Sequence, residues 1–203
     1  MKKILFLFIV LFLNNFLIAQ EYTIFYHKAL RIELQYPNYW KTHSFPDKYI
    51  DFDYNSLSFE ELHDMLRLSA ISPILFIKKY EEIYYGVNPS IRINAYRIPY
   101  YLYNEFSIDI IIDFYLPYKS ADFFINETIY IDNVEVNYRK ILDYAIYEDI
   151  NYDERFERCT EYFILKRCED KFIIIFEITY GKNNIIAQEE IQRIINTIRI
   201  IKD

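Results

Sequence analysis

The sequence predicts an α+β domain built on one antiparallel β-sheet of about six to eight strands, with helices packed against it. Apolar and polar residues alternate along several segments that are separated by turn-forming residues, which is typical of β-hairpins. Near the C-terminus the apolar positions change to helical spacing. The composition, with 53% hydrophobic and 26% charged residues and 6 prolines, is that of a packed globular chain. A length of 203 residues fits a single domain.

The N-terminus has the pattern of a secretory signal peptide. Two lysines precede an apolar run over residues 4–13, and a second apolar patch ends at Ala19. We expect residues 1–19 to be a signal peptide and residues 20–203 to form the domain, exported to the periplasm or the extracellular space, with no membrane span after cleavage. The alternative is an uncleaved membrane anchor, because the two asparagines that follow the run interrupt it only mildly.

The first part of the domain predicts a hairpin followed by a helix. Residues 22–28 and 32–36 alternate as two strands. Ser58 with Glu61 three residues later fits a capping box, and helical spacing of apolar residues continues until Pro73. A helix is therefore expected between Ser58 and Pro73.

The middle of the chain predicts a second hairpin and a second helix. Residues 74–77 and 91–95 form the two strands, and the loop between them contains Gly86 and Pro89. Residues 107–116 place apolar side chains at helical spacing with two aspartates on the opposite side.

The last part predicts a long strand, a hairpin and a final helix. A turn at Asp132 and Asn133 precedes an alternating strand up to Ile146, in which Lys140 interrupts the apolar side and is compatible with a bulge. The acidic residues between Glu148 and Glu157 are interpreted as a solvated linker.

The closing elements have the strongest patterns in the chain. Residues 161–167 and 172–180 form the final hairpin, and the second of these strands is apolar on both sides, which predicts a central strand covered on both faces. From Ala187 to Ile198 the apolar residues form a helical stripe that should cover the sheet.

Three segments resemble the Mog1/PsbP-like family. Ile32–Trp40, with Pro37 three residues before Trp40, is similar to the strand that opens that family's fold. Asn88–Ile91 is similar to its central hairpin turn, and the run from Phe172 to Ile200 looks like its last strand, helix and extended tail. The resemblance implies an α/β/α sandwich with helices on both faces of the sheet. It also implies a non-enzymatic binding or assembly factor, and it transfers no catalytic residue.

Composition excludes several classes of chemistry. Only two glycines are present, Gly86 and Gly181, and their separation is incompatible with phosphate-binding loops and nucleophile elbows. The formal net charge of −7 disfavours nucleic acid as a partner. The three histidines lack the spacing of metal ligands. We therefore expect no cofactor and no metal.

The two cysteines are predicted to be free thiols. Cys159 and Cys168 lie nine residues apart, about 30 Å along an extended strand, whereas a disulfide needs Cα atoms about 4.4–6.8 Å apart. A disulfide made possible by a break in the strand, or a pairing between molecules, is the alternative.

Clustered tyrosines are the candidate binding residues. Tyrosine combines a rigid apolar ring with a polar tip, which suits interfaces and sugar stacking. The candidates are Tyr84, Tyr85, Tyr100, Tyr101 and Tyr103. The function predicted is an exported, non-catalytic binding or assembly module that acts through a protein partner. The alternatives are a small-molecule or glycan-binding domain with a Tyr-lined cleft, and an enzyme whose carboxylates, Glu33 with Asp47 or Asp51, meet only in the fold.

Overall fold

The computed structural model describes most of the predicted strands and the last helix. The described residues are 21–44, 58, 60–61, 64, 73–81, 86–98, 104, 107, 109–110, 123–149, 152–167 and 171–201. The elements are β1 (Tyr22–His27), β2 (Ile32–Pro37), β3 (Lys41–Ser44), β4 (Leu75–Lys78), β5 (Ser90–Arg97), β6 (Phe123–Ile131), β7 (Val134–Asp149), β8 (Tyr152–Arg167), β9 (Phe172–Gly181), α4 (Ile185–Ile195) and β10 (Arg199–Ile200).

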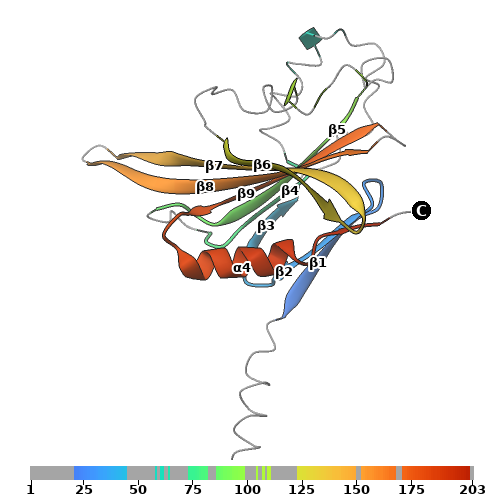
Figure 1. Ribbon diagram of the computed structural model, residues 1–203. Helices are drawn as coiled ribbons and strands as arrows, with labels where there is room; N and C mark the ends of the chain where they lie inside the picture. The colour runs from blue at the N-terminus through green and yellow to red at the C-terminus, as the bar shows by residue number, and fades with distance from the viewer. Residues whose placement is uncertain are drawn as a thin grey trace, which may run out of the picture.

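The strands form two sheets instead of the single sheet predicted. Seven strands pair antiparallel in the order β3-β4-β5-β9-β8-β7-β6, which agrees with the six to eight strands expected. The first hairpin leaves this sheet and forms a three-stranded sheet in the order β1-β2-β10. Figure 1 shows α4 and the small sheet on the same side of the seven-stranded sheet.

The central strand β9 is buried on both faces, as its two-sided apolar pattern predicted. Ile174 and Phe176 point to the core under α4, whereas Ile173 and Ile175 point to the opposite face, and all four are at most 2% exposed. On that opposite face the guanidinium of Arg139 contacts the carboxylate of Asp109 at 3.0 Å.

Helices on both faces are not what the structure describes. Among the described residues α4 is the one helix with assigned bounds, and it lies on one face (Figure 1). The fold is therefore a sheet-rich α+β fold. The sequence underestimated strand content because β7 and β8 each extend to 16 residues and take up residues interpreted as a linker.

The acidic residues between Glu148 and Glu157 are part of a strand ladder. β7 and β8 remain in register to the pair Asp149 and Tyr152, so the interpretation as a solvated linker is wrong. Lys140 also stands in an unbroken ladder with β8, opposite Glu161, while the register shift lies in β6 between Phe123 and Ile125.

The starts of the two other predicted helices fall within the described residues. The Ser58 backbone N–H donates to Glu61 Oε2 at 2.8 Å, and the Glu61 N–H donates to Ser58 Oγ at 3.3 Å, which is the reciprocal capping box that was predicted. Ser107 Oγ accepts from the Ile110 N–H at 3.1 Å. The remainder of both predicted helices lies largely outside the described residues.

Local backbone chemistry explains the predicted turn between β6 and β7. Asp132 and Asn133 have φ angles of 49° and 59°. Short polar side chains tolerate this left-handed region, and two such residues in succession form the tight turn that suits the twist of a hairpin. The turn prediction is confirmed.

Side chains fasten the small sheet to α4 and to β6. Thr197 Oγ1, just after α4, accepts from the Gln35 N–H at 2.8 Å and donates to the Gln35 carbonyl at 3.1 Å. Asp132 Oδ2 accepts from the Ile200 N–H at 2.9 Å. No helix within the described ranges is long and apolar enough to cross a membrane.

Candidate functional site

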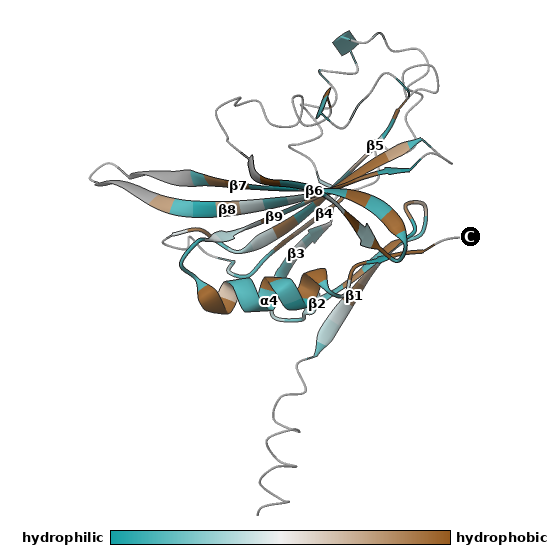
Figure 2. Cartoon of the chain, viewed as in Figure 1, coloured by the Kyte–Doolittle hydropathy of each residue, from teal (hydrophilic) through white to brown (hydrophobic). Residues whose placement is uncertain are grey.

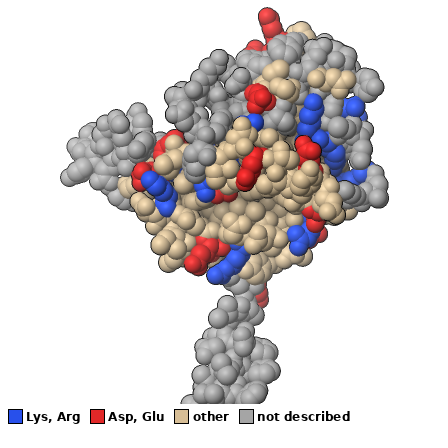
Figure 3. Space-filling view, viewed as in Figure 1, with Lys and Arg blue, Asp and Glu red and all other residues tan. Residues whose placement is uncertain are grey.

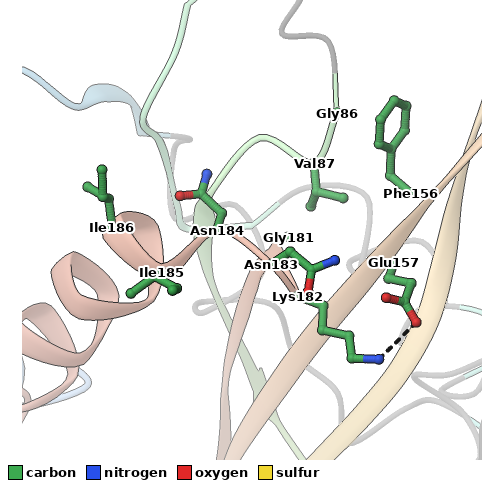
Figure 4. A pocket seen from close by; sticks show the side chains of 10 residues that line it. All are labelled: Gly86, Val87, Phe156, Glu157, Gly181, Lys182, Asn183, Asn184, Ile185 and Ile186. Atoms are coloured by element: carbon green, nitrogen blue, oxygen red, sulfur yellow. Dashed lines mark hydrogen bonds and ion pairs between the residues drawn. The ribbon is translucent and has the colours of Figure 1, made fainter.

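A pocket opens where β9 turns into α4. Its volume is about 670 Å³. Its lining residues are Gly86, Val87, Phe156, Glu157, Gly181, Lys182, Asn183, Asn184, Ile185 and Ile186. They come from the segment before β5, from β8 and from the β9–α4 turn, as Figure 4 shows. The pocket therefore depends on the tertiary fold and not on one local motif.

Hydrogen bonds fix the rim of this pocket. Asn184 is the N-cap of α4, and its Oδ1 accepts from the Ala187 N–H at 3.0 Å. Lys182 binds Glu157 twice, through an ion pair with 2.8 Å between Nζ and Oε1 and through its backbone N–H, which donates to the Glu157 carbonyl at 3.0 Å. The start of α4 is thereby held against β8, and Figure 4 shows the side-chain pair.

Two isoleucines project from the first turn of α4 beside the pocket. Ile185 is 67% exposed and Ile186 is 69% exposed. The buried residues of α4 are Ala187, Ile191 and Ile194. With about 100° between successive residues of an α-helix, Ile185 lies nearly opposite Ala187 on the helix surface. In Figure 2 the start of α4 is accordingly brown although it faces solvent.

A second cleft, of about 440 Å³, lies between the β6–β7 hairpin and the end of α4. Two tyrosines line it: Tyr130, which is 69% exposed, and Tyr138, whose hydroxyl donates to Glu161 Oε2 at 3.0 Å. Polar side chains of Glu127, Asp132, Gln192, Asn196 and Arg199 complete much of its wall. An aromatic ring beside several amide and carboxylate groups is suited to a polar ring-shaped ligand.

Beneath this cleft a buried carboxylate collects three donors. Glu161 is 6% exposed and accepts from Tyr138, from the Tyr180 hydroxyl and from Lys140, with 2.9 Å between Lys140 Nζ and Glu161 Oε1. Lys140 Nζ also donates to the Tyr180 hydroxyl at 2.8 Å. Each polar group of the cluster therefore has a partner inside it, as burial requires.

The two phenols of this cluster stay protonated near neutral pH. Burial, together with the Glu161 carboxylate, raises the pKa of Tyr138 and of Tyr180 far above the ordinary phenol value. Burial also raises the pKa of Cys159, so this free thiol is not an activated thiolate. The chemistry of the cluster is that of a structural hydrogen-bond network. Cys168 lies outside the described residues.

The structure does not describe the tyrosines that were selected from the sequence. Tyr84, Tyr85, Tyr100, Tyr101 and Tyr103 all lie outside the described residues. Asp47 and Asp51 do as well, while Glu33 pairs opposite Tyr26 in the small sheet. Sequence reasoning missed Ile185 and Ile186 because the predicted stripe began at Ala187. Extending the helix two residues toward Asn184 places both isoleucines away from the stripe.

Metal-ligand clusters are not found among the residues that the structure describes. No group of three or more His, Cys, Asp or Glu side chains there converges as a cation site. Figure 3 shows acidic and basic side chains interspersed over the described part of the face in view. The described part of this face has no surface of a single charge sign that would favour a polyanion.

Comparisons with known proteins identify structural neighbours. No protein-family profile and no curated protein sequence matches this chain. The solution structure of cyanobacterial PsbP (CyanoP) from Synechocystis sp. PCC 6803 matches with a TM-score of 0.49 and 9% identity, covering 90% of this chain and 94% of that chain. A crystal structure from Bacteroides thetaiotaomicron matches with a TM-score of 0.45 and 14% identity, covering 91% of this chain and half of the other.

Proposed function

We propose that this protein is an exported, non-catalytic binding or assembly module whose protein-contact surface is centred on the pocket at the start of α4. The exposure of Ile185 and Ile186 beside that pocket is the observation that carries the proposal. Covering a fully exposed isoleucine side chain is worth roughly 1.5–3 kcal/mol. A partner that covers both would therefore gain substantial binding energy from two residues that α4 itself leaves in solvent.

The surroundings of the two isoleucines have the layout of an interface. Apolar Val87 and Phe156 extend the apolar area into the pocket, while the Lys182–Glu157 ion pair and Asn183 supply a polar rim. Interfaces combine an apolar centre with such a rim. The partner expected is a protein segment with an apolar side chain for the pocket and with amide or charged groups for the rim.

A non-catalytic role is supported by the state of the buried polar cluster. The pKa of each phenol that contacts Glu161 is raised, so neither Tyr138 nor Tyr180 supplies a phenolate near neutral pH. Glu161 is in turn occupied by Lys140. Catalysis by proton transfer favours groups whose pKa lies near the working pH.

Export is tested on the chain recovered from its host after cell fractionation. N-terminal sequencing of the purified chain should begin at Gln20, in the periplasmic or extracellular fraction. A chain that retains Met1 and remains in the membrane fraction contradicts signal cleavage.

The protein-contact surface is tested by photocrosslinking in the native envelope. A photoreactive amino acid at position 186 should give one crosslinked species of defined mass, and the same amino acid at position 201 should not give it. Ile201 is the matched control because it is also apolar and 41% exposed. Replacing Ile185 with Glu should abolish the crosslink made from position 186, whereas Ile201→Glu should leave it intact. Equal crosslinking from positions 186 and 201 contradicts the proposal.

The second cleft supports a different function, the binding of a small polar ligand such as a glycan. The observation that favours it is the presence of Tyr130 and Tyr138 beside amide and carboxylate groups. Calorimetric titration with a panel of neutral oligosaccharides should detect binding that Tyr130→Ala removes and that Tyr39→Ala, at a tyrosine 42% exposed elsewhere, preserves. Binding unaffected by Tyr130→Ala contradicts a role for this cleft.

A further inference from the structure

Within the described residues, the outer edge of β1 lacks the features by which the other sheet edges discourage pairing with a further strand. Between Tyr22 and His27 there is no charged residue and no proline, and the β1–β2 register is continuous. Within the described ranges β1 pairs with β2 alone. Backbone groups on the far side of such a strand form a template for a further strand.

The other edges carry the features that normally prevent such pairing. β3 has four residues, and its Lys41 forms an ion pair with Glu81 at 3.2 Å. β6 has a register shift and an exposed Glu127. β10 has two residues. Short strands, charges and bulges are the usual means by which proteins block edges, so β1 is an exception within its own molecule.

One face of β1 carries an exposed apolar stripe. Tyr22, Ile24 and Tyr26 alternate along the strand and are 41%, 60% and 51% exposed. In register they lie beside Pro37, Gln35 and Glu33 of β2. The residues between them turn the other way, and Phe25 packs against the core. The stripe therefore faces away from the core, and the polar residues of β2 border it.

We propose that β1 is a dimerisation edge, which pairs antiparallel with β1 of a second copy of this chain about a two-fold axis at Ile24. The sequence of the strand is self-complementary in this register. Ile24 faces Ile24 of the second copy, each Tyr22 faces a Tyr26, and each Thr23 faces a Phe25. The six exposed apolar side chains become three cross-strand pairs, and aromatic and β-branched pairs of this kind stabilise sheets.

The polar groups at the ends of the strand also complement each other. In this register Glu21 of one copy faces His27 of the other. His27 Nδ1 accepts from the Leu30 N–H at 3.1 Å. Glu21 Oε2 accepts from Asn38 Nδ2 at 2.8 Å, so Oε1 is the oxygen available to a second donor. A two-fold axis creates this contact twice.

The pairing joins two three-stranded sheets into one six-stranded sheet. A contact of one strand from each copy belongs to the small interface class, below the roughly 1,200–2,000 Å² of stable complexes. We therefore expect a reversible dimer with a Kd of roughly micromolar size. The surface is separate from the start of α4, so dimerisation is independent of the function proposed above.

Disulfide trapping tests both the dimer and its register. The background is the full chain with Cys168→Ser, since the remaining Cys159 is buried. Ile24→Cys should give a covalent dimer under mild oxidation, because residues directly opposite each other place their Cβ atoms about 4.5–5.5 Å apart. Tyr26→Cys should remain monomeric, because the two copies of residue 26 lie about 13 Å apart along the strands. The double variant Tyr22→Cys with Tyr26→Cys should crosslink again.

Sedimentation equilibrium of the chain without added cysteines provides the second measurement. Ile24→Lys places two like charges opposite each other and should weaken the dimer at least tenfold, whereas Ile201→Lys should leave it unchanged. Far-UV circular dichroism verifies that both variants are folded. A monomer throughout the micromolar range, or equal trapping of Ile24→Cys and Tyr26→Cys, overturns the proposal. Ile185→Glu should still dimerise, which separates this result from a failure of the α4 surface.

Discussion

The two ends of α4 use the same residue type in opposite ways. Ile191 and Ile194, in the last two turns, are 1% and 0% exposed, whereas Ile185 and Ile186, in the first turn, are about two-thirds exposed. Their sequence neighbourhoods are equally polar, so composition does not separate them. Their angular positions on the helix separate them. Ile191 and Ile194 lie on the side of Ala187 that packs on the sheets, whereas Ile185 and Ile186 do not.

The buried end of α4 contributes to stability, and the exposed end belongs to the proposed contact surface. The buried isoleucines join the core formed by β9, β8 and the small sheet. The exposed pair contributes little to that core and is held in place by the N-cap and by the Lys182–Glu157 contact. Substitutions at the two ends should therefore affect different measurements.

The largest effect is expected at the buried end. Ile194→Ala removes three buried carbon atoms and leaves a cavity, which should lower the free energy of unfolding by about 2–5 kcal/mol. Urea denaturation followed by circular dichroism measures this change. A loss below 1 kcal/mol would mean that the end of α4 is not packed as described.

The N-cap is expected to have an intermediate effect. Asn184→Ala removes the acceptor of the Ala187 N–H and should cost about 1 kcal/mol of unfolding free energy. Asn184→Asp is the matched control, since it retains an acceptor and should lose much less stability. Because the cap orients the first turn, Asn184→Ala should also weaken the crosslink made from position 186.

Strand patterns were the part of the fold that the sequence predicted well. Alternation located β1, β2, β4, β5 and β9 to within a few residues, and the Asp132–Asn133 turn followed from side chains that tolerate positive φ. These features depend on local chemistry. The split into two sheets does not, because it depends on long-range contacts such as that between Thr197 and Gln35.

The candidate surfaces were less predictable for the same reason. The pocket at α4 combines Val87, Phe156 and Ile186, which are far apart in the sequence. Lys140 looked like an interruption of an apolar strand side, and only the β7–β8 register shows that Glu161 lies opposite it. The exposed isoleucines were accessible to sequence reasoning, but only if the helix had been started at Asn184.

Alkaline pH should lower the free energy of unfolding through the buried phenol of Tyr162. Burial, and next the Glu177 carboxylate, raise the pKa of Tyr162. Its phenol stays protonated in the folded chain while the unfolded chain ionises near pH 10, so stability is complete below pH 10 and falls as the pH rises. Tyr162 should account for a loss of less than about 1 kcal/mol at pH 10.5.

Denaturation at pH 8 and pH 10.5 measures this loss. Tyr162→Phe should reduce the difference between the two pH values, whereas Tyr130→Phe, at a tyrosine 69% exposed, should not. An identical pH difference in both variants would show that Tyr162 ionises as easily in the folded chain as in the unfolded one.

The smallest effect on stability is expected at the exposed end, where the effect on binding should be largest. Ile185→Ala removes little buried area and replaces a β-branched residue by the best helix former, so the unfolding free energy should change by less than about 0.5 kcal/mol. The photocrosslink from position 186 should nevertheless fall several-fold, because the partner loses an apolar contact. If Ile185→Ala cost as much stability as Ile194→Ala, Ile185 would belong to the core, and the functional difference between the two ends of α4 would disappear.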